Sequence, residues 1–558
     1  MSTTINKEKQ LNGRLDVVLF YTDQAQLCCV ASPHFGYDMA KGLKWGPEFL
    51  ADLADEILSK LPEETLQETV TYLQDLDWPW GSTCSGTDSP AFGFKGLAKS
   101  LSRRGVRFKQ KHIFSAEREP SKEDFIIRQA PPAEFFRDIN DVANDHGAWC
   151  SIATTSGQRR WRLRSADAGH EVKEYISGFS CKSVSGLAGS KDGAESCIDN
   201  ASMQTGETFA GVERYVKKRK PMCIILENVT GLRRNGQDLL VLRKIEALGY
   251  HGFVREINSV TWGIPQSRPR LWFLFVRCDI GGATFTKDEY VTHCDSNFDD
   301  ISVGFPMMNI DDFLLPDSAL AVRETRVACA ERAQTICRGG AGARVWVKRH
   351  AEMQKRRGMG SLLDSNWRPE LSALFPDYCA LPDRYKELLA MRGVQFPHPS
   401  QLVLNLSQSD VSMGHGYTPT IAPKGLFWLS WRIRALRGSE ALSLQCIHLN
   451  ADDREHYLDS LLHDLAGNAF NAGCFLATQV VAFTVMAKMS KRARATASGE
   501  GEPPNKIARF SGGVFVKFHV GIILQSSFPP FRKKPVSTLD VPNSTFEIPR
   551  QEGHCICE

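Results

Sequence analysis

The sequence lacks the features that mark several classes of protein. None of its 16 cysteines stands in a Cys-x-x-Cys pair, which argues against a zinc framework and gives little reason to expect disulfides. The first residues lack the basic start and apolar core of a signal peptide, and no uninterrupted apolar run reaches the roughly 18 residues of a membrane span. We therefore expect a soluble intracellular protein with no metal and no membrane partner.

Charge of one sign is also scarce. The formal net charge is +4 over 558 residues, with an isoelectric point near 8.3. Such a mild excess does not make a nucleic-acid-binding surface by itself, so any contact with nucleic acid has to come from local basic clusters. An apolar content of 42% and a charged content of 24% are those of a globular chain that buries a core.

From residue 80 onward, short apolar runs with strand character alternate with helical patterns. Such βαβ alternation predicts an α/β fold with an open, mostly parallel sheet and helices on both faces. In folds of this kind, ligands bind at the carboxyl ends of the strands. Upstream, residues 47–76 carry apolar residues at helical spacing, interrupted at Pro62, and predict two short amphipathic helices.

Three predicted strand ends carry polar or small residues suited to a nucleotide-like ligand. The first strand ends in a turn at Gly86, where a ligand can approach the backbone. The second ends at Glu117, whose carboxylate can accept from both hydroxyls of a ribose. The third is followed by Asp138, which can accept from an adenine amino group. A turn glycine, a surface glutamate and a capping aspartate are the plain alternatives for the three positions.

A single cysteine follows another predicted strand. In the stretch EYISGFSCKSVSG, the apolar pair Tyr175 and Ile176 ends at Gly178, and Cys181 comes directly afterwards among small and hydroxyl residues. A thiol presented on a loop acts as a nucleophile when nearby positive charge favours its thiolate, whereas a thiol inside a strand is a small inert hydrophobe.

These pieces and several others, taken in order, resemble the motifs of the cytosine-5 DNA methyltransferase family. The chain carries SGTDSPAFG, Ser115-Ala116-Glu117, Asp138-Ile139, GFSCKSVSG and Glu227-Asn228-Val229 in that sequence. Gln266-Ser267-Arg268-Pro269-Arg270, RALRGSEALSLQ and AGNAF follow. The resemblance covers about residues 80–485 and implies a Rossmann-like methyltransferase sheet with a smaller target-recognition region.

The chemistry also follows from the residue types. Carbon 5 of a pyrimidine takes a methyl group from S-adenosylmethionine only after a nucleophile adds at carbon 6, and Cys181 is the candidate. Glu227, at the end of a buried strand suited to a raised pKa, can supply a proton or hydrogen bond at ring nitrogen 3. Arg268 and Arg270 are expected to favour the thiolate and to stabilise charge at the ring oxygen. The resemblance implies the same four roles.

The expected cofactor is S-adenosyl-L-methionine. It would lie over the Gly86 turn, with its ribose on Glu117 and its adenine near Asp138 and Ile139. The segment 467–470 is expected to open a long apolar helix over 475–486 that, by resemblance, folds back beside the first motif. The predicted cofactor-binding residues are Ser85, Gly86, Thr87, Glu117, Asp138, Ile139, Asn468 and Ala469.

Three positions depart from the family pattern. Cys84 stands where the family usually has a leading aromatic residue. Asp88 stands where the family usually repeats glycine, and Ser180 stands where the family has proline before the nucleophile. Proline would rigidify the loop that presents the thiol, so serine predicts a more mobile loop. Three functions therefore stay open: a DNA cytosine-5 methyltransferase, a tRNA-directed member of the family, and a catalytically inactive nucleic-acid-binding paralogue.

The expected division of the chain follows the motifs, and DNA is the expected partner, with RNA as an alternative. Basic clusters at 344–357, inside the insert, and at 158–164, QRRWRLR, are candidates for contact with the nucleic-acid backbone. Lys491, Arg492 and Arg494 would serve a nuclear-import signal. The sequence gives no oligomeric state. We expect a helical extension over 1–79, the catalytic core over 80–278, a target-recognition insert over 279–408, the final motifs over 409–488 and a disordered basic tail over 489–558.

Overall fold

The computed structural model describes most of residues 43–498. The described ranges are 43–144, 147–153, 159–164, 171–184, 197–281, 285–319, 322, 401–405, 412–423, 425–432 and 434–498. All of them lie in the first of two compact units, Met1–Gly501. The basic run 344–357 and the residues after 498 lie outside the described part of the chain.

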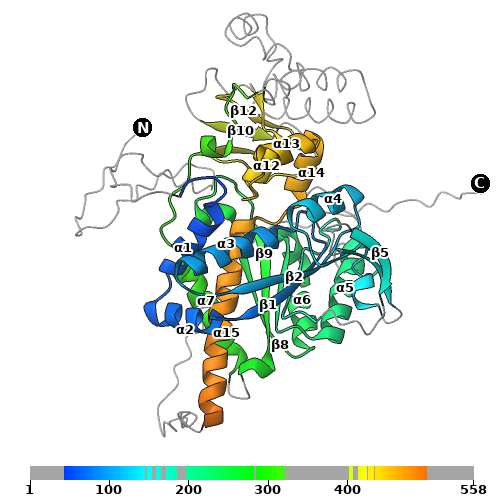
Figure 1. The fold of residues 1–558 in the computed structure, drawn as a ribbon, viewed down its shortest axis with the longest axis vertical. Helices are drawn as coiled ribbons and strands as arrows, with labels where there is room; N and C mark the ends of the chain where they lie inside the picture. The colour runs from blue at the N-terminus through cyan, green and yellow to red at the C-terminus, as the bar shows by residue number, and fades with distance from the viewer. Residues whose placement is uncertain are drawn as a thin grey trace, which may run out of the picture. The chain divides into compact units, whose positions relative to one another are not determined.

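A nine-stranded sheet with the strand order β5-β4-β3-β2-β1-β6-β7-β9-β8 forms the centre of this unit (Figure 1). The five strands from β3 to β7 in this order pair in parallel, and an antiparallel pair of strands flanks them on each side. The predicted α/β class is confirmed. The strands are β1 (Asp77–Thr83), β2 (Lys109–Ala116), β3 (Glu134–Phe136), β4 (Ala148–Ala153), β5 (Arg159–Arg164), β6 (Glu174–Ser177), β7 (Cys223–Val229), β8 (Tyr250–Ile257) and β9 (Arg270–Arg277).

Helices cover both faces of this sheet. Alternate residues of β7 show how the two cores are built, since Ile225 packs in one apolar cluster while Ile224 and Leu226 pack in the other. The first cluster lies under α1, α3, α7 and α15, and the second lies under α5 and α6. The helices of the described residues are α1 (Phe49–Ser59), α2 (Glu63–Leu73), α3 (Ser89–Arg103), α4 (Pro120–Gln129), α5 (Gln204–Arg219), α6 (Gln237–Glu246), α7 (Lys287–Ile301), α12 (Gly438–Ser443), α13 (Ala451–His456), α14 (Asp459–Asn468) and α15 (Ala472–Ser498).

The connections turn to opposite sides at the centre of the sheet. The chain leaves β1 through α3 to reach β2 on one side, and it leaves β6 through α5 to reach β7 on the other. Because β1 and β6 are neighbours, the loops that follow them diverge, and open α/β folds bind ligands in the crevice formed at such a point. The Gly86 turn and the Cys181 loop are these two loops.

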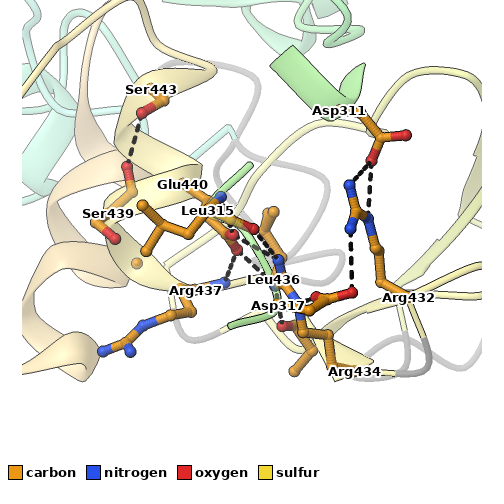
Figure 2. A network of polar contacts seen from close by, with 12 residues as sticks. Asp311, Leu315, Asp317, Arg432, Arg434, Leu436, Arg437, Ser439, Glu440 and Ser443 are labelled. Atoms are coloured by element: carbon orange, nitrogen blue, oxygen red, sulfur yellow. Dashed lines mark hydrogen bonds and ion pairs between the residues drawn. The ribbon is translucent and has the colours of Figure 1, made fainter. Parts of the chain in front are cut away.

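A second sheet, antiparallel and smaller, has the order β11-β10-β12-β13. A network of ion pairs holds it to the chain before it (Figure 2). Both terminal nitrogens of the buried Arg434 donate to the Glu440 carboxylate, at 2.7 and 2.8 Å, and Asp317 bridges Arg434 and Arg432. Arg432 also donates to Asp311. The strands are β10 (Leu402–Asn405), β11 (Met413–His415), β12 (Phe427–Leu429) and β13 (Arg434–Ala435).

Each expected boundary of the insert falls between elements that pack or pair with each other. Helix α7 lies inside the predicted insert 279–408, yet its Phe298 and Ile301 are buried in the core, and its Asn297 donates to Thr484 of α15 at 2.9 Å. The boundary at 408 separates β10 from β12, which pair with each other. Helix α7 was missed because polar residues dominate its sequence and only its buried face is apolar.

The predicted tail also begins too early. Helix α15 continues to Ser498, and Lys491 and Arg492 form ion pairs with Glu68 and Glu289. By length and composition, the 38-residue stretch Asp459–Thr496 is apolar enough to cross a membrane, but its apolar window is fully buried in the structure. Burial of this kind is that of a core helix, and α15 packs against α1, α2, α3 and α7 (Figure 1).

The first residue of β6 is a fully buried acid. Glu174 accepts a hydrogen bond from Trp78 Nε1 at 2.6 Å and from Gln479 Nε2 at 3.0 Å, and its other oxygen has no hydrogen-bond partner. Burial raises the pKa of Glu174 to about 8, because the charged carboxylate loses its hydration. The carboxyl group therefore joins β1, β6 and α15 in its protonated form at neutral pH.

We expect Glu174→Gln to stabilise the protein selectively at high pH. Since folding raises the pKa of this acid, its stabilising contribution is complete below about pH 4, the unfolded value, and is lost as the pH rises through about 8. The thermal midpoint of the variant should gain on that of the wild type between pH 6 and pH 9, measured by circular dichroism. The exposed Glu56→Gln is the control, and an equal difference at both pH values would contradict the prediction.

Candidate active site

The loop after β1 has an unusual backbone. Cys84, Gly86 and Asp88 all have positive φ, at 51°, 58° and 54°, so left-handed residues alternate along the turn. A side chain at Gly86 would also crowd the carbonyl oxygen of Asn468, which lies 3.1 Å from the position of a Cβ atom. Glycine at this position therefore lets the α14 terminus approach the turn closely.

Asp88 points away from this turn into a buried polar cluster. Its carboxylate accepts hydrogen bonds from Ser82 Oγ, at 2.7 Å, and from Ser115 Oγ, and His112 Nε2 lies 3.2 Å away. Its side chain is fully buried and does not line the cleft described below. The acid that replaces a family glycine is therefore satisfied by β1 and β2, and it does not project into the cleft.

Glu117 and Asp138 follow β2 and β3, as predicted. Glu117 accepts from the backbone N–H of Gly86 at 2.9 Å, and from those of Arg118 and Glu119 at 3.0 and 3.2 Å. Asp138 accepts from the Asn140 N–H at 2.8 Å and from the Arg118 guanidinium at 3.1 Å. The two carboxylates are thus held at neighbouring strand ends, each by backbone donors.

The Cys181 loop is fixed from several directions. Asn228 of β7 donates from Nδ2 to the carbonyl of Phe179 at 2.9 Å. On the other side, the Ser180 N–H donates to Thr208 Oγ1 at 3.0 Å, and a turn closes through the N–H of Val184 and the carbonyl of Cys181, also at 3.0 Å. The expectation of a mobile loop at Ser180 is therefore opposed by hydrogen bonds on both sides of the cysteine.

The structure separates the two predicted arginines. Arg270 Nε lies 3.1 Å from the carboxylate of Glu227, near the carboxyl end of β7. Arg268 is 3% exposed, and its terminal nitrogens donate to the carbonyls of Ile421, Gly467 and Ala469 at 3.0, 3.1 and 2.6 Å. Its donors are thus occupied by backbone, except Nε, which has no partner. Arg270 is the cation that pairs with the predicted acid, whereas Arg268 joins three segments of the fold.

Burial decides the direction in which the pKa values of Glu227 and Cys181 are shifted. It raises the pKa of Glu227 and outweighs the two arginines, which favour the charged form, so the predicted raised pKa is confirmed. Burial likewise raises the pKa of the Cys181 thiol, with a further contribution from Glu227, although Arg270 and Arg268 oppose it. Both arginines act in the expected direction, since each favours the thiolate, but burial outweighs them and the pKa of the thiol is raised overall.

One cleft of about 210 Å³ lies at the β1/β6 switch point, and Asp88 does not line it. All four predicted catalytic residues line it, with five of the eight predicted cofactor residues. Ser85, Thr87 and Ala469 do not line it; Thr87 and Ala469 are buried, and the Ser85 hydroxyl bonds to that of Ser82. The predicted residues that line the cleft are Cys181, Glu227, Arg268, Arg270, Gly86, Glu117, Asp138, Ile139 and Asn468.

Sequence reasoning missed part of the wall and misplaced the last motif. Gly467 does not open the long helix, since α14 ends at Asn468 and α15 begins at Ala472. This break exposes Asn468 to the cleft. The lining residues that were not predicted include Phe179, Gln204, Glu207 and Thr208. Of these, Glu207 and Thr208 could have been suggested by the sequence, because they place an acidic and a hydroxyl side chain in the first turns of the helix after the cysteine loop.

The comparisons with known proteins agree with this geometry. The family model for C-5 cytosine-specific DNA methylases matches residues 164–301, which include Cys181, Glu227, Arg268 and Arg270. DNA (cytosine-5-)-methyltransferase DMT5 of Cryptococcus neoformans var. grubii is 25% identical over 468 residues, covering 77% of this chain. The corresponding protein of Verticillium dahliae is 23% identical over 475 residues, covering 75% of this chain. Residues 164–301 thus match the C-5 cytosine-specific DNA methylase family.

The matched relatives are much longer than this chain. The aligned region covers only 18% and 20% of the two curated relatives, so the chain spans about a fifth of their length. Among solved structures, the S. pombe Dnmt2 methyltransferase aligns with 73% of this chain and 98% of its own, at 11% identity and a TM-score of 0.39.

We expect different consequences from removing the two arginines. Arg268→Gln leaves buried carbonyls without donors and should lower the free energy of unfolding by about 3 kcal/mol. Arg270→Gln should cost less stability but should raise the pKa of Cys181 further, because a cation that favours the thiolate is lost. Thermal unfolding and the pH profile of Cys181 alkylation by iodoacetamide, followed by mass spectrometry, measure the two effects.

Arg277→Gln, at the far end of β9, is the control for both measurements. It should leave the alkylation profile of Cys181 unchanged, since Arg277 pairs with Asp279. A larger shift of the alkylation midpoint for Arg268→Gln than for Arg270→Gln, without loss of stability, would reverse the assignment.

Proposed function

We propose that this chain is the catalytic region of a DNA (cytosine-5) methyltransferase that uses S-adenosylmethionine, the methyl donor used generally in the family. One observation carries the proposal. A cysteine, a carboxyl group with a raised pKa and an arginine line the same cleft as two carboxylates at the ends of β2 and β3. Nucleophile, acid and cofactor site would thereby share one crevice of a methyltransferase-type sheet.

The residues at one end of the cleft fit the cofactor. Glu117 uses backbone N–H groups to fix both of its oxygens and retains acceptor capacity for the hydroxyls of a ribose. Asp138 and Ile139 line the place expected for an adenine ring, and Gly86 and Asn468 approach each other where the methionine part would lie. When bound, S-adenosylmethionine supplies an electrophilic methyl group.

The other end of the cleft holds the groups for the pyrimidine. Cys181 would add through its sulfur to carbon 6 of a flipped cytosine, and the same carbon–sulfur bond would break when carbon 5 loses its proton. Glu227, whose pKa is raised by burial, would in its protonated form donate to ring nitrogen 3 and so limit the negative charge of the ring. Arg270 would hold Glu227 in place, and Arg268 would hold the wall of the cleft.

Strand β5 supports nucleic acid as the substrate. It exposes Arg160 and Arg162, and on the same hairpin Trp161 and Trp149 are 38% and 60% exposed. Exposed arginines next to aromatic rings suit phosphate contacts combined with packing against the backbone. DNA is the substrate we propose. Location in the nucleus also remains a proposal, although Lys491 and Arg492 are engaged in ion pairs of α15.

Covalent trapping tests the proposal. With S-adenosylmethionine and duplex DNA that contains 5-fluorocytosine, the wild type should form an adduct that survives denaturation, because fluorine at carbon 5 blocks the elimination. Cys181→Ser should form none, whereas Cys84→Ser, which changes the other cysteine of the cleft, should still form it. Gel electrophoresis and mass spectrometry detect the adduct.

The substrate arms of this experiment distinguish the alternatives. An adduct with tRNA and none with DNA, across several sequence contexts, would point to the tRNA-directed activity. Binding of nucleic acid without an adduct on either substrate would point to an inactive paralogue and refute the catalytic proposal.

A further inference from the structure

The residue before the cysteine gives the loop a donor that proline lacks. Ser180 has a backbone N–H, and this N–H donates to Thr208 Oγ1 at 3.0 Å. Proline has no N–H, so the bond exists only because this chain departs from the family at this position. The serine thus loses the fixed φ of proline and gains a tether to helix α5.

Thr208 is oriented to receive this bond. Its hydroxyl donates to the carbonyl of Gln204 at 2.9 Å and lies 3.1 Å from that of Thr205, so its hydrogen is used within α5. A lone pair of Thr208 Oγ1 is therefore free to accept the hydrogen bond from the Ser180 N–H. Thr208 also lines the cleft, so the tether lies beside the thiol.

A second threonine of the same helix holds the other side of the cysteine. The Ser183 N–H donates to Thr205 Oγ1 at 3.2 Å, and Thr205 is fully buried. Residues three apart share a face of a helix, so Thr205 and Thr208 meet the loop together. Their partners stand one residue before and two residues after Cys181.

We infer that Thr208, assisted by Thr205, is a positioning residue that fixes the Cys181 loop in place of the missing proline. The inference rests on the proposed function only for its catalytic consequence. The position of the thiol and the protection of the Ser180 N–H are properties of the free protein and are measured without substrate.

A double-mutant cycle in the full chain tests the coupling. Thr208→Val removes the acceptor at nearly constant volume, Thr208→Ser keeps it, and Ser180→Pro removes the donor. The rate of Cys181 alkylation by iodoacetamide, followed on the Cys181 peptide by mass spectrometry, reports how firmly the half-buried thiol is held. Thermal unfolding establishes that each variant is folded.

We expect Thr208→Val to speed alkylation of Cys181 about five- to tenfold, as the loss of one hydrogen bond implies. Thr208→Ser should react like the wild type. In the Ser180→Pro background, Thr208→Val should change nothing, because proline offers no N–H to lose. Hydrogen exchange of the 179–184 segment should rise in Thr208→Val and not in Thr208→Ser.

Equal effects of Thr208→Val in both backgrounds, or no effect in either, would overturn the inference. If methyl transfer is observed, Thr208→Val should lower kcat and leave the KM for S-adenosylmethionine unchanged, since the cofactor residues are untouched. If the coupling is found and no adduct forms on any nucleic acid, the positioning role stands and the proposed catalysis fails. An adduct without coupling would support the proposed catalysis and refute the positioning role.

Discussion

The buried guanidinium of Arg268 is the contact on which the geometry of the cleft depends. Removing an arginine from water is costly, and the cost is offset here by carbonyls of the segment before β12 and of the α14–α15 junction. Those carbonyls belong to residues more than 150 positions later in the chain. Because Gly467 and Ala469 flank Asn468, the Arg268 guanidinium also fixes the end of the cleft that Asn468 lines.

Charge inside the cleft is controlled by burial more than by pairing. Glu227 and Cys181 both have raised pKa values although two arginines lie near them, so burial disfavours the charged form of each group. A neutral acid is the form that donates to a pyrimidine nitrogen. A neutral thiol is not the nucleophile, so the proposed reaction requires that the thiol lose its proton as the base is engaged.

Local sequence predicted the strand ends well and the long-range contacts poorly. Gly86, Glu117, Asp138 and Cys181 follow their strands because apolar runs and turn residues mark the strand boundaries. The break between α14 and α15 was missed because apolar residues continue across it. The backbone partners of Arg268 were not predicted because they are distant carbonyls, which no residue spacing reveals. The direction of the Cys181 pKa shift likewise depends on a balance between burial and charge.

The departures from the family pattern at Asp88 and Ser180 have a common physical form. At Asp88, the carboxylate that glycine would lack accepts hydrogen bonds from the hydroxyls of Ser82 and Ser115. At Ser180, the backbone N–H that proline would lack donates a hydrogen bond to Thr208 Oγ1. A buried polar group without a hydrogen-bond partner at either position would lower the free energy of unfolding by about 1–3 kcal/mol. If the site had lost its function and were decaying, such groups would be left without partners. Matched partners on neighbouring elements instead indicate that both loops are still held in a defined shape.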